Sequence, residues 1–165
     1  MFKKLYGVVF LLTLWNNPCE AQSSNGSQEA AIWGVSSCDV YLSISISNNI
    51  IHLGSPTSIH CSIKNSSTNV VAVSDTGIPI YDSDVSMIDG SGKNFDLTPA
   101  DKLFRAVYMN IAVKINPKQT YVWDIPLNYG KNIEPGSFKL KVSRQFYIQD
   151  RKYNVTSNLL VVQVK

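Results

Sequence analysis

The sequence has few charged residues, and they are not concentrated anywhere. Asp, Glu, Lys and Arg make up 16% of its 165 residues, below the share of about a quarter that is usual for soluble proteins. No run of Lys or Arg exceeds two residues, and the net charge is +3. Nucleic-acid binding needs a concentrated basic face with aromatic side chains that stack on bases. We therefore expect no nucleic acid among the partners.

The sequence also lacks helical patterning and long apolar runs. No segment repeats apolar residues at i, i+3, i+4 and i+7 over more than about six residues. The longest apolar run, Leu5–Trp15, is too short to cross a bilayer as a helix. The sequence therefore predicts neither a helical bundle nor an integral membrane protein.

Motifs that support catalysis are absent as well. The stretch Gly90-Ser91-Gly92-Lys93 lacks the spacing of a phosphate-binding loop and indicates a hairpin turn. There is no Gly-x-Ser-x-Gly elbow and no Cys/His pair with a plausible orienting acid. We therefore expect a protein that is not an enzyme and that uses no cofactor.

Metal-ligand patterns are weak. The two histidines, His52 and His60, stand alone, and His60 is out of phase with the apolar residues around it, which is typical of surface imidazoles. Asp82-Ser83-Asp84 resembles the start of a calcium loop, but no Gly and distal Glu follow at the required spacing. The sequence predicts no metal site. It favours turn-forming and solvating roles for a set of loop aspartates: Asp75, Asp82, Asp84, Asp89 and Asp96.

The first residues are typical of a secretory signal peptide. Lys3 and Lys4 precede the apolar run Leu5–Trp15, and Cys19-Glu20-Ala21 supplies small residues of the kind that a signal peptidase recognises. We predict residues 1–21 as the signal peptide, with cleavage after Ala21 and an exported protein, periplasmic or secreted. Less favoured alternatives are a lipoprotein anchored through Cys19 and a buried first strand.

Cleavage would leave two cysteines, Cys38 and Cys61, and an oxidising compartment favours a disulfide between them. A hairpin of Asp39–Ser47 with Thr57–Lys64 would place both near the same end of the pair. The bridge would contribute about 3 kcal/mol in the chain-entropy model. The alternative is two unrelated thiols, one of them buried as a small hydrophobe.

Residues 22–37 are rich in Gln, Ser, Asn, Gly and Ala and are interpreted as a flexible leader, in which Trp33 either packs on the domain edge or marks a contact. Residues 38–165 form the predicted domain. Apolar and polar residues alternate there with period 2, which indicates half-buried strands. The predicted strands are Asp39–Ser47, Thr57–Lys64, Val70–Val73, Val85–Ile88, Val107–Ile115, Tyr121–Leu127, Phe138–Val142 and Leu159–Val164. Phe95–Leu97 is a candidate for the strand that returns from the Asp89-Gly90 turn.

The order of these strands predicts the fold class. Strand patterns recur every 10–15 residues or so with turn residues between them, which is typical of two packed antiparallel sheets. The prediction is all-β: an immunoglobulin-like antiparallel β-sandwich of seven to eight strands. The last segment, Glu134–Lys165, is predicted to close the domain as an antiparallel pair around the polar residues Gln149–Lys152.

Several motifs resemble those of known sandwich domains. The first motif is Gly54-Ser55-Pro56, which leads to a strand ending in Lys64-Asn65-Ser66-Ser67. In the second, Tyr81-Asp82 precedes Val85, Asp89 and Gly92. In the third, Pro135-Gly136 precedes Phe138 and Arg144. This order is similar to immunoglobulin/fibronectin-type domains of exported bacterial proteins. It resembles, more distantly, bacterial intracellular proteinase-inhibitor domains, with Trp123 and Pro135-Gly136 as the shared features. The resemblance implies a sandwich fold and no catalytic residues.

Function in a sandwich usually resides in its loops. Two predicted loops, Thr76–Tyr81 and Tyr129–Ile133, carry aromatic and apolar residues suited to a partner-contact surface; alternatively, both merely cap the ends of the sandwich. The leading hypothesis is a non-enzymatic module that binds another protein or an envelope component. The alternatives are a proteinase inhibitor acting through an exposed loop and a carbohydrate-binding module. The candidate contact residues are Ile78, Pro79, Ile80, Tyr81, Tyr129, Lys131, Asn132 and Ile133.

Two further residues call for a prediction. Trp123 is in phase with the apolar residues of its strand, so we expect it in the core. Arg144 falls on the apolar phase of its own strand. It is therefore expected either to extend to the edge of the sheet or to pair with a loop aspartate such as Asp82 or Asp84.

Overall fold

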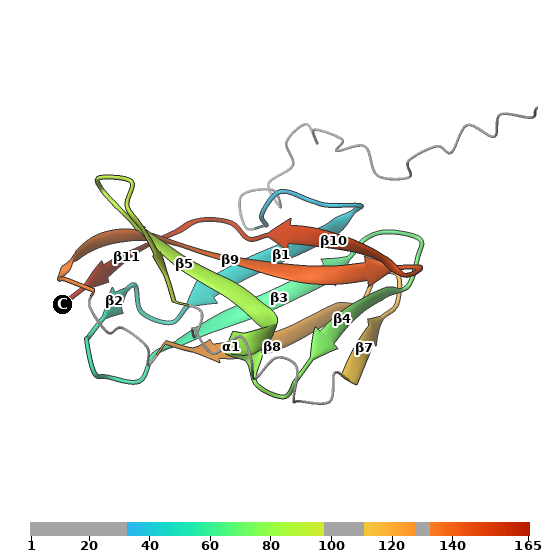
Figure 1. Ribbon diagram of the computed structural model, residues 1–165, viewed down its shortest axis with the longest axis horizontal. Helices are drawn as coiled ribbons and strands as arrows, with labels where there is room; N and C mark the ends of the chain where they lie inside the picture. Colours follow the sequence, from blue (N-terminus) through green and yellow to red (C-terminus); the bar gives the residue numbers. More distant parts are fainter. Residues whose placement is uncertain (1–32, 98–110, 128–132) are drawn as a thin grey trace, which may run out of the picture.

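The computed structural model describes residues 33–97, 111–127 and 133–165, which form an all-β sandwich (Figure 1). Two packed sheets account for almost all of the regular structure, so the predicted β-sandwich is confirmed. The predicted signal peptide, most of the predicted leader and the contact residues Tyr129, Lys131 and Asn132 lie outside the described residues. So does the first part of the predicted strand 107–115.

The smaller sheet has three antiparallel strands in the order β1-β3-β8. Its register is continuous, with Ile44 opposite Cys61 and Cys61 opposite Trp123. Alternate side chains point inward, as the period-2 pattern predicted. The strands are β1 (Val40–Ile46), β3 (Ser58–Asn65) and β8 (Thr120–Pro126).

The larger sheet is organised around one long strand, β9 (Gly136–Ile148). Strands β11 and β10 pair along one edge of β9, while β5 and β4 pair along the other. A short parallel strand, β2, extends the sheet beyond β11. The remaining strands are β2 (Ile50–Ile51), β4 (Val71–Asp75), β5 (Ser83–Asp89), β6 (Asn94–Asp96), β7 (Ile111–Ile115), β10 (Arg151–Thr156) and β11 (Leu160–Val164).

The C-terminal segment differs in detail from the predicted pair. Strand β9 continues beyond Val142 to Ile148, and β10 returns along it before β11 begins. Gln149 and Asp150, which were predicted to belong to a polar connection, form the turn, and both have positive φ, as a type I′ hairpin turn requires. Strand β10 was missed because its residues are mostly polar and few of them are buried.

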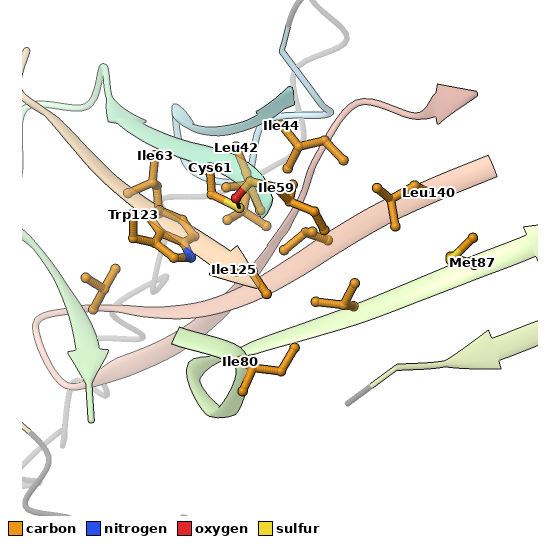
Figure 2. Packing of buried hydrophobic residues seen from close by; sticks show 14 of the residues in the cluster. Leu42, Ile44, Ile59, Cys61, Ile63, Ile80, Met87, Trp123, Ile125 and Leu140 are labelled. Atoms are coloured by element: carbon orange, nitrogen blue, oxygen red, sulfur yellow. Dashed lines mark hydrogen bonds between the residues drawn. The ribbon is translucent and has the colours of Figure 1, made fainter. Parts of the chain in front are cut away.

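The core lies between the two sheets. Leu42, Ile63 and Ile125 from the smaller sheet face Leu140 and Phe146 from β9, and all five side chains are essentially inaccessible to solvent. Figure 2 shows the inner side chains of both sheets in this layer. Trp123 is also buried, with 8% exposure, so its predicted place in the core is confirmed.

Residues 33–37, which were predicted as part of the leader, are joined to the domain by backbone hydrogen bonds. The amide of Gly34 donates to the carbonyl of Leu42, and Ser37 and Val40 exchange two hydrogen bonds. A Cβ atom on Gly34 would lie 2.0 Å from the carbonyl oxygen of Thr156, so only glycine fits at this close approach. Residues 33–37 therefore pack against the domain edge, and Trp33 is the first described residue.

The free edge of β1 is covered further along by a side chain. The Asn158 amide accepts a hydrogen bond from the Ile44 amide and donates one to the Ile44 carbonyl. Exposed strand edges template aggregation, so native sheets cover them. Asn158 covers this edge by reproducing the pattern of a neighbouring strand.

The predicted disulfide between Cys38 and Cys61 is wrong. Cys61 is a free thiol, buried at the middle of the smaller sheet. Cys61 lies opposite Ile44 in the middle of the β1–β3 pair, whereas Cys38 precedes Val40, the first residue of β1. The four residues from Val40 to Ile44 span about 13 Å of extended strand, which is beyond the reach of a disulfide.

Candidate functional site

One edge of β9 carries a break in the larger sheet. Strand β4 pairs with β9 at Val73 and Phe146, and the pairing with β5 begins at Ser83 and Arg144. Between these points residues 76–82 leave the sheet as a loop that ends in the short helix α1 (Pro79–Asp82). We call this break the fork. Its inner side holds Arg144, and its outer side holds a pocket.

Arg144 fills the inner side of the fork and is 2% exposed. One of its terminal nitrogens donates to the carbonyl oxygen of Ser74 at 2.5 Å, near the end of β4. Its guanidinium carbon lies 4.2 Å from the ring centroid of Trp123 and 5.7 Å from that of Tyr121, within range of a cation–π interaction. Burial lowers the pKa of Arg144 from its ordinary value, although a guanidinium stays protonated in proteins.

The structure corrects the prediction for Arg144. Its side chain does not extend to the sheet edge, and its hydrogen bond goes to a backbone carbonyl, not to a carboxylate. The carboxylates of Asp82 and Asp75 act on it electrostatically from beyond hydrogen-bonding distance. Its Nε and Nη1 atoms, with the indole nitrogen of Trp123 and the hydroxyl of Ser83, have no hydrogen-bond partner among the described residues.

Asp75 is held by two donors beside this group. The Tyr121 hydroxyl donates to one carboxylate oxygen at 2.7 Å, and the Gly77 amide donates to the other at 2.8 Å. The Tyr121 bond is the main reason that the pKa of Asp75 lies below its ordinary value. Burial, followed by the bond to Asp75, raises the pKa of Tyr121 to about 12.

Asp82 organises the loop of the fork. Its Oδ2 accepts hydrogen bonds from the Thr76 amide at 2.9 Å and the Thr76 hydroxyl at 3.0 Å. Partial burial nevertheless raises the pKa of Asp82, because a desolvated carboxylate loses its hydration. The two bonds join the start of the loop to its end, so the loop has a defined shape.

The outer side of the fork forms a pocket of about 130 Å³. Two tyrosines, Tyr81 from the loop and Tyr147 from β9, contribute aromatic rings to its lining, while Asp82 and Asp84 contribute carboxylates. The pocket therefore combines aromatic surface with negative charge. Its complete lining is Ser74, Thr76, Tyr81, Asp82, Asp84, Gln145 and Tyr147.

The predicted contact residues that the structure describes differ in how far they are buried. Ile80 is 1% exposed and belongs to the core (Figure 2), Ile78 packs partly against it, and Ile133 is 7% exposed. Ile80 is the buried residue of α1, which begins at Pro79, and burial of an isoleucine contributes about 2–3 kcal/mol. Ile80 and Ile133 are therefore not contact residues on an exposed surface, whereas Tyr81 lines the pocket.

The outer face of the smaller sheet carries a second polar group. His60 Nδ1 lies 2.5 Å from a carboxylate oxygen of Asp124, and its Nε2 lies 3.2 Å from the Ser47 hydroxyl. His60 and Asp124 are register partners in β3 and β8. His60 is an exposed imidazole, as predicted, but it does not stand alone, because Asp124 and Ser47 contact its two ring nitrogens. No sequence signal identified its two partners, because their proximity depends on the strand register.

Within the described part of the chain, no three His, Cys, Asp or Glu side chains come close enough together to hold a metal ion. No helix within residues 33–97, 111–127 and 133–165 is long and apolar enough to cross a membrane. Among the aspartates weighed for calcium, Asp89 accepts bonds from the Ser91 amide and hydroxyl and from the Lys93 amide, a turn-forming role.

Comparisons with known proteins yield remote structural likenesses. No family model and no curated protein matches the chain. The solved structures that match include the structural genomics target SoR45, at 10% identity and a TM-score of 0.48, covering 75% of this chain and 86% of that one. The C-terminal domain of wzt matches at 11% identity and a TM-score of 0.44, covering 75% of this chain and 70% of that one.

A third solved structure is the alkylpurine DNA glycosylase AlkC of Pseudomonas fluorescens bound to DNA. It matches at 9% identity and a TM-score of 0.41, covering 77% of this chain and 30% of that protein. These likenesses are too distant to transfer a function. The resemblance to exported bacterial sandwich domains stays a prediction.

Proposed function

We propose that the chain is an exported, non-enzymatic binding module that contacts another protein or an envelope component through the fork pocket. The observation that carries this proposal is the pocket between Tyr81 and Tyr147, which includes Asp82 and Asp84. Its volume of about 130 Å³ suits one side chain of a partner.

The chemistry of the pocket favours a basic side chain. Aromatic faces attract cations, and the carboxylates of Asp82 and Asp84 supply complementary negative charge. Burial raises the pKa of Asp82, so an incoming ammonium or guanidinium group would stabilise a carboxylate that is poorly solvated in the free protein. A lysine or arginine presented on a partner's surface would meet both requirements.

Site-specific crosslinking tests this proposal. A photoreactive benzoylphenylalanine at position 147 should crosslink to one partner in cells, and the Asp84→Asn change should weaken that crosslink. The same amino acid at position 161 is the matched control, because Val161 is 59% exposed on the same sheet and does not line the pocket. Equal crosslinking from both positions, or none from position 147, would contradict the proposal.

A carbohydrate-binding module is the second candidate, and one observation favours it. Trp33 packs edge-on against Tyr41 with ring centroids 6.4 Å apart, and the Lys64 ammonium lies 5.7 Å from the Trp33 centroid. Tyr41 and Lys64 are register partners in the smaller sheet. Two residues further along β1, Ser43 lies opposite Ser62, which in turn lies opposite the exposed Val122 of β8. Aromatic rings beside hydroxyl groups suit a sugar.

Fluorescence titration with a glycan panel tests this alternative. Binding should change the emission of Trp33, and the Trp33→Phe change should abolish the response while the buried Trp123 continues to emit. The third hypothesis, a proteinase inhibitor, required an exposed loop at Thr76–Tyr81 or at Tyr129–Ile133, and most of the second loop lies outside the described residues. For the first loop, the outcome depends on where Ile80 packs. The inward packing of Ile80 does not favour that arrangement.

A further inference from the structure

Ser47, His60 and Asp124 form a hydrogen-bonded series on the outer face of the smaller sheet. The Ser47 hydroxyl lies 3.2 Å from His60 Nε2, and His60 Nδ1 lies 2.5 Å from Asp124 Oδ1. The two contacts are made by the two different nitrogens of the His60 imidazole. This is the connectivity by which a histidine, oriented by a carboxylate, activates a serine hydroxyl as a nucleophile.

The strand register produces this series from residues that are far apart in the sequence. The central strand β3 places His60 beside Asp124 of β8 on one side and beside Ser45 of β1 on the other. Ser47 follows two residues after Ser45, just beyond the end of β1 at Ile46. Alternation places Ser45 and Ser47 on the same side of the chain.

The hydrogen bonds define the role of each atom. An ionised carboxylate only accepts hydrogen bonds, so the nitrogen that faces Asp124, Nδ1, must carry the ring proton. In the neutral imidazole, Nε2 then has a lone pair that accepts the Ser47 proton. The same tautomer serves the general base in a serine nucleophile pair.

We propose that Ser47 is a nucleophilic site that accepts an acyl group from activated esters, with His60 as its general base and Asp124 as a positioning residue. The Ser47 oxygen forms a bond to the ester carbonyl carbon while its proton passes to His60 Nε2. The leaving oxygen takes the electron pair of the broken carbon–oxygen bond and the proton from His60 Nε2, so that the alcohol or phenol is released and His60 is neutral again. Water then attacks the acyl-serine, and its proton passes through His60 as the carboxylic acid and the free serine are released.

Exposure limits the substrates that fit this site. The side chains of His60 and Asp124 are 50% and 61% exposed, so water is not excluded. General base assistance alone contributes on the order of 100- to 10,000-fold. The expected reaction is therefore with small esters that have good leaving groups. The proposal does not depend on the fork pocket, and its confirmation would replace the description of the module as non-enzymatic.

The full mature protein treated with p-nitrophenyl acetate tests this inference. Peptide mass mapping should find one acetyl group on Ser47, formed on the order of 100-fold faster than on a serine without base assistance. The matched control is Ser45→Ala, which removes the hydroxyl beside the same histidine without removing the Ser47 bond. This variant should acylate at Ser47 as fast as the parent protein does.

Two further variants separate catalysis from an incidental adduct. His60→Gln should reduce the rate of Ser47 acylation to that of an unassisted serine. Asp124→Asn should slow it and shift the His60 tautomer, which ¹⁵N NMR of the imidazole reports. An unmodified Ser47, or a Ser47 adduct that forms equally fast in His60→Gln, would overturn the inference. All these residues are exposed, so the variants should fold, and circular dichroism checks this.

Discussion

The guanidinium carbon of Arg144 lies 4.2 Å from the ring centroid of Trp123, and both side chains are buried between the two sheets. Arg144 belongs to β9 and Trp123 to β8, so the contact joins the larger sheet to the smaller one. The contact also lies at the point along β9 where pairing with β4 ends and pairing with β5 begins. The positive charge is thus buried at the one described position where β9 changes partners along this edge.

Arg144→Ala should lower the free energy of unfolding by about 2–4 kcal/mol, because it removes a large buried side chain and leaves a cavity. Arg144→Met should cost less. A similar volume is kept, and the polar atoms Nε and Nη1, which have no partner among the described residues, are removed. Urea unfolding of both variants provides the measurement. An equal loss in the two would show that the charge outweighs the packing.

Tyr121→Phe should change how stability depends on acid. The Tyr121 bond lowers the pKa of Asp75, so the stability it contributes is present above the ordinary aspartate pKa of about 3.9. That contribution is lost as the pH falls through the lower folded-state pKa. The stability difference between parent and variant should therefore be larger at pH 6 than at pH 2.

Urea unfolding across this pH range measures the difference. Tyr153→Phe is the matched control, since its ring stacks on Phe146 at 5.5 Å between centroids and no aspartate bond to its hydroxyl is found in the described residues. Its stability difference should stay constant with pH. A constant difference for Tyr121→Phe as well would remove the assigned role of the Asp75 bond.

Asn65 should be one of the most sensitive positions in the chain. It is fully buried; its amide group donates to the carbonyls of Asn69 and Ile115, and its oxygen accepts from the Ser67 amide and hydroxyl. Asn65→Ala removes all four bonds, at about 1–3 kcal/mol for each buried group that stays unsatisfied, while the Ser67 hydroxyl and the Asn69 carbonyl keep their bond to each other. Thermal or urea unfolding measures the loss.

Asn65→Asp provides the sharper comparison. Aspartate has nearly the same shape, but it places a second acceptor against two carbonyl oxygens. It should therefore be at least as destabilising at neutral pH as Asn65→Ala. A mild effect of Asn65→Asp would show that the site tolerates an acceptor, and would contradict the assigned hydrogen bonds.

Cys61 should resist alkylation in the native protein. Burial raises the pKa of its thiol to about 12, so almost no thiolate is present at pH 8, and only the thiolate is an effective nucleophile. Iodoacetamide at pH 8 should leave the peptide containing Cys61 unmodified, and the same treatment in urea should label it. Mass mapping gives both results. Rapid labelling of the native protein would contradict the buried thiol.

Local pattern was enough to predict most of the strands. In β1, Val40, Leu42 and Ile44 alternate with polar residues, and the structure buries all three. Trp123 was assigned to the core for the same reason. Strand β10 was not recognised, since Val155 is the one residue within it that is buried, and its pairing depends on the turn at Gln149 and Asp150.

Apolar composition alone was a poor guide to the surface. The loop containing Ile78 and Ile80 was predicted as a contact surface, because isoleucine in a turn-rich segment is also what an exposed binding loop contains. The difference lies in α1, which turns Ile80 into the core. Nothing in a short segment of sequence states which direction such a turn faces.

The inward-facing side chains of each main strand could be predicted from the sequence, because the alternation of a strand is a local property of its backbone. The residues that meet across strands could not be predicted, because they depend on how the whole domain folds. The β1–β3 register separates Cys38 from Cys61, and the break between β4 and β5 brings Arg144 to Trp123. Register depends on packing of the whole domain, since sliding a strand by two residues keeps the same inward face and changes every cross-strand neighbour.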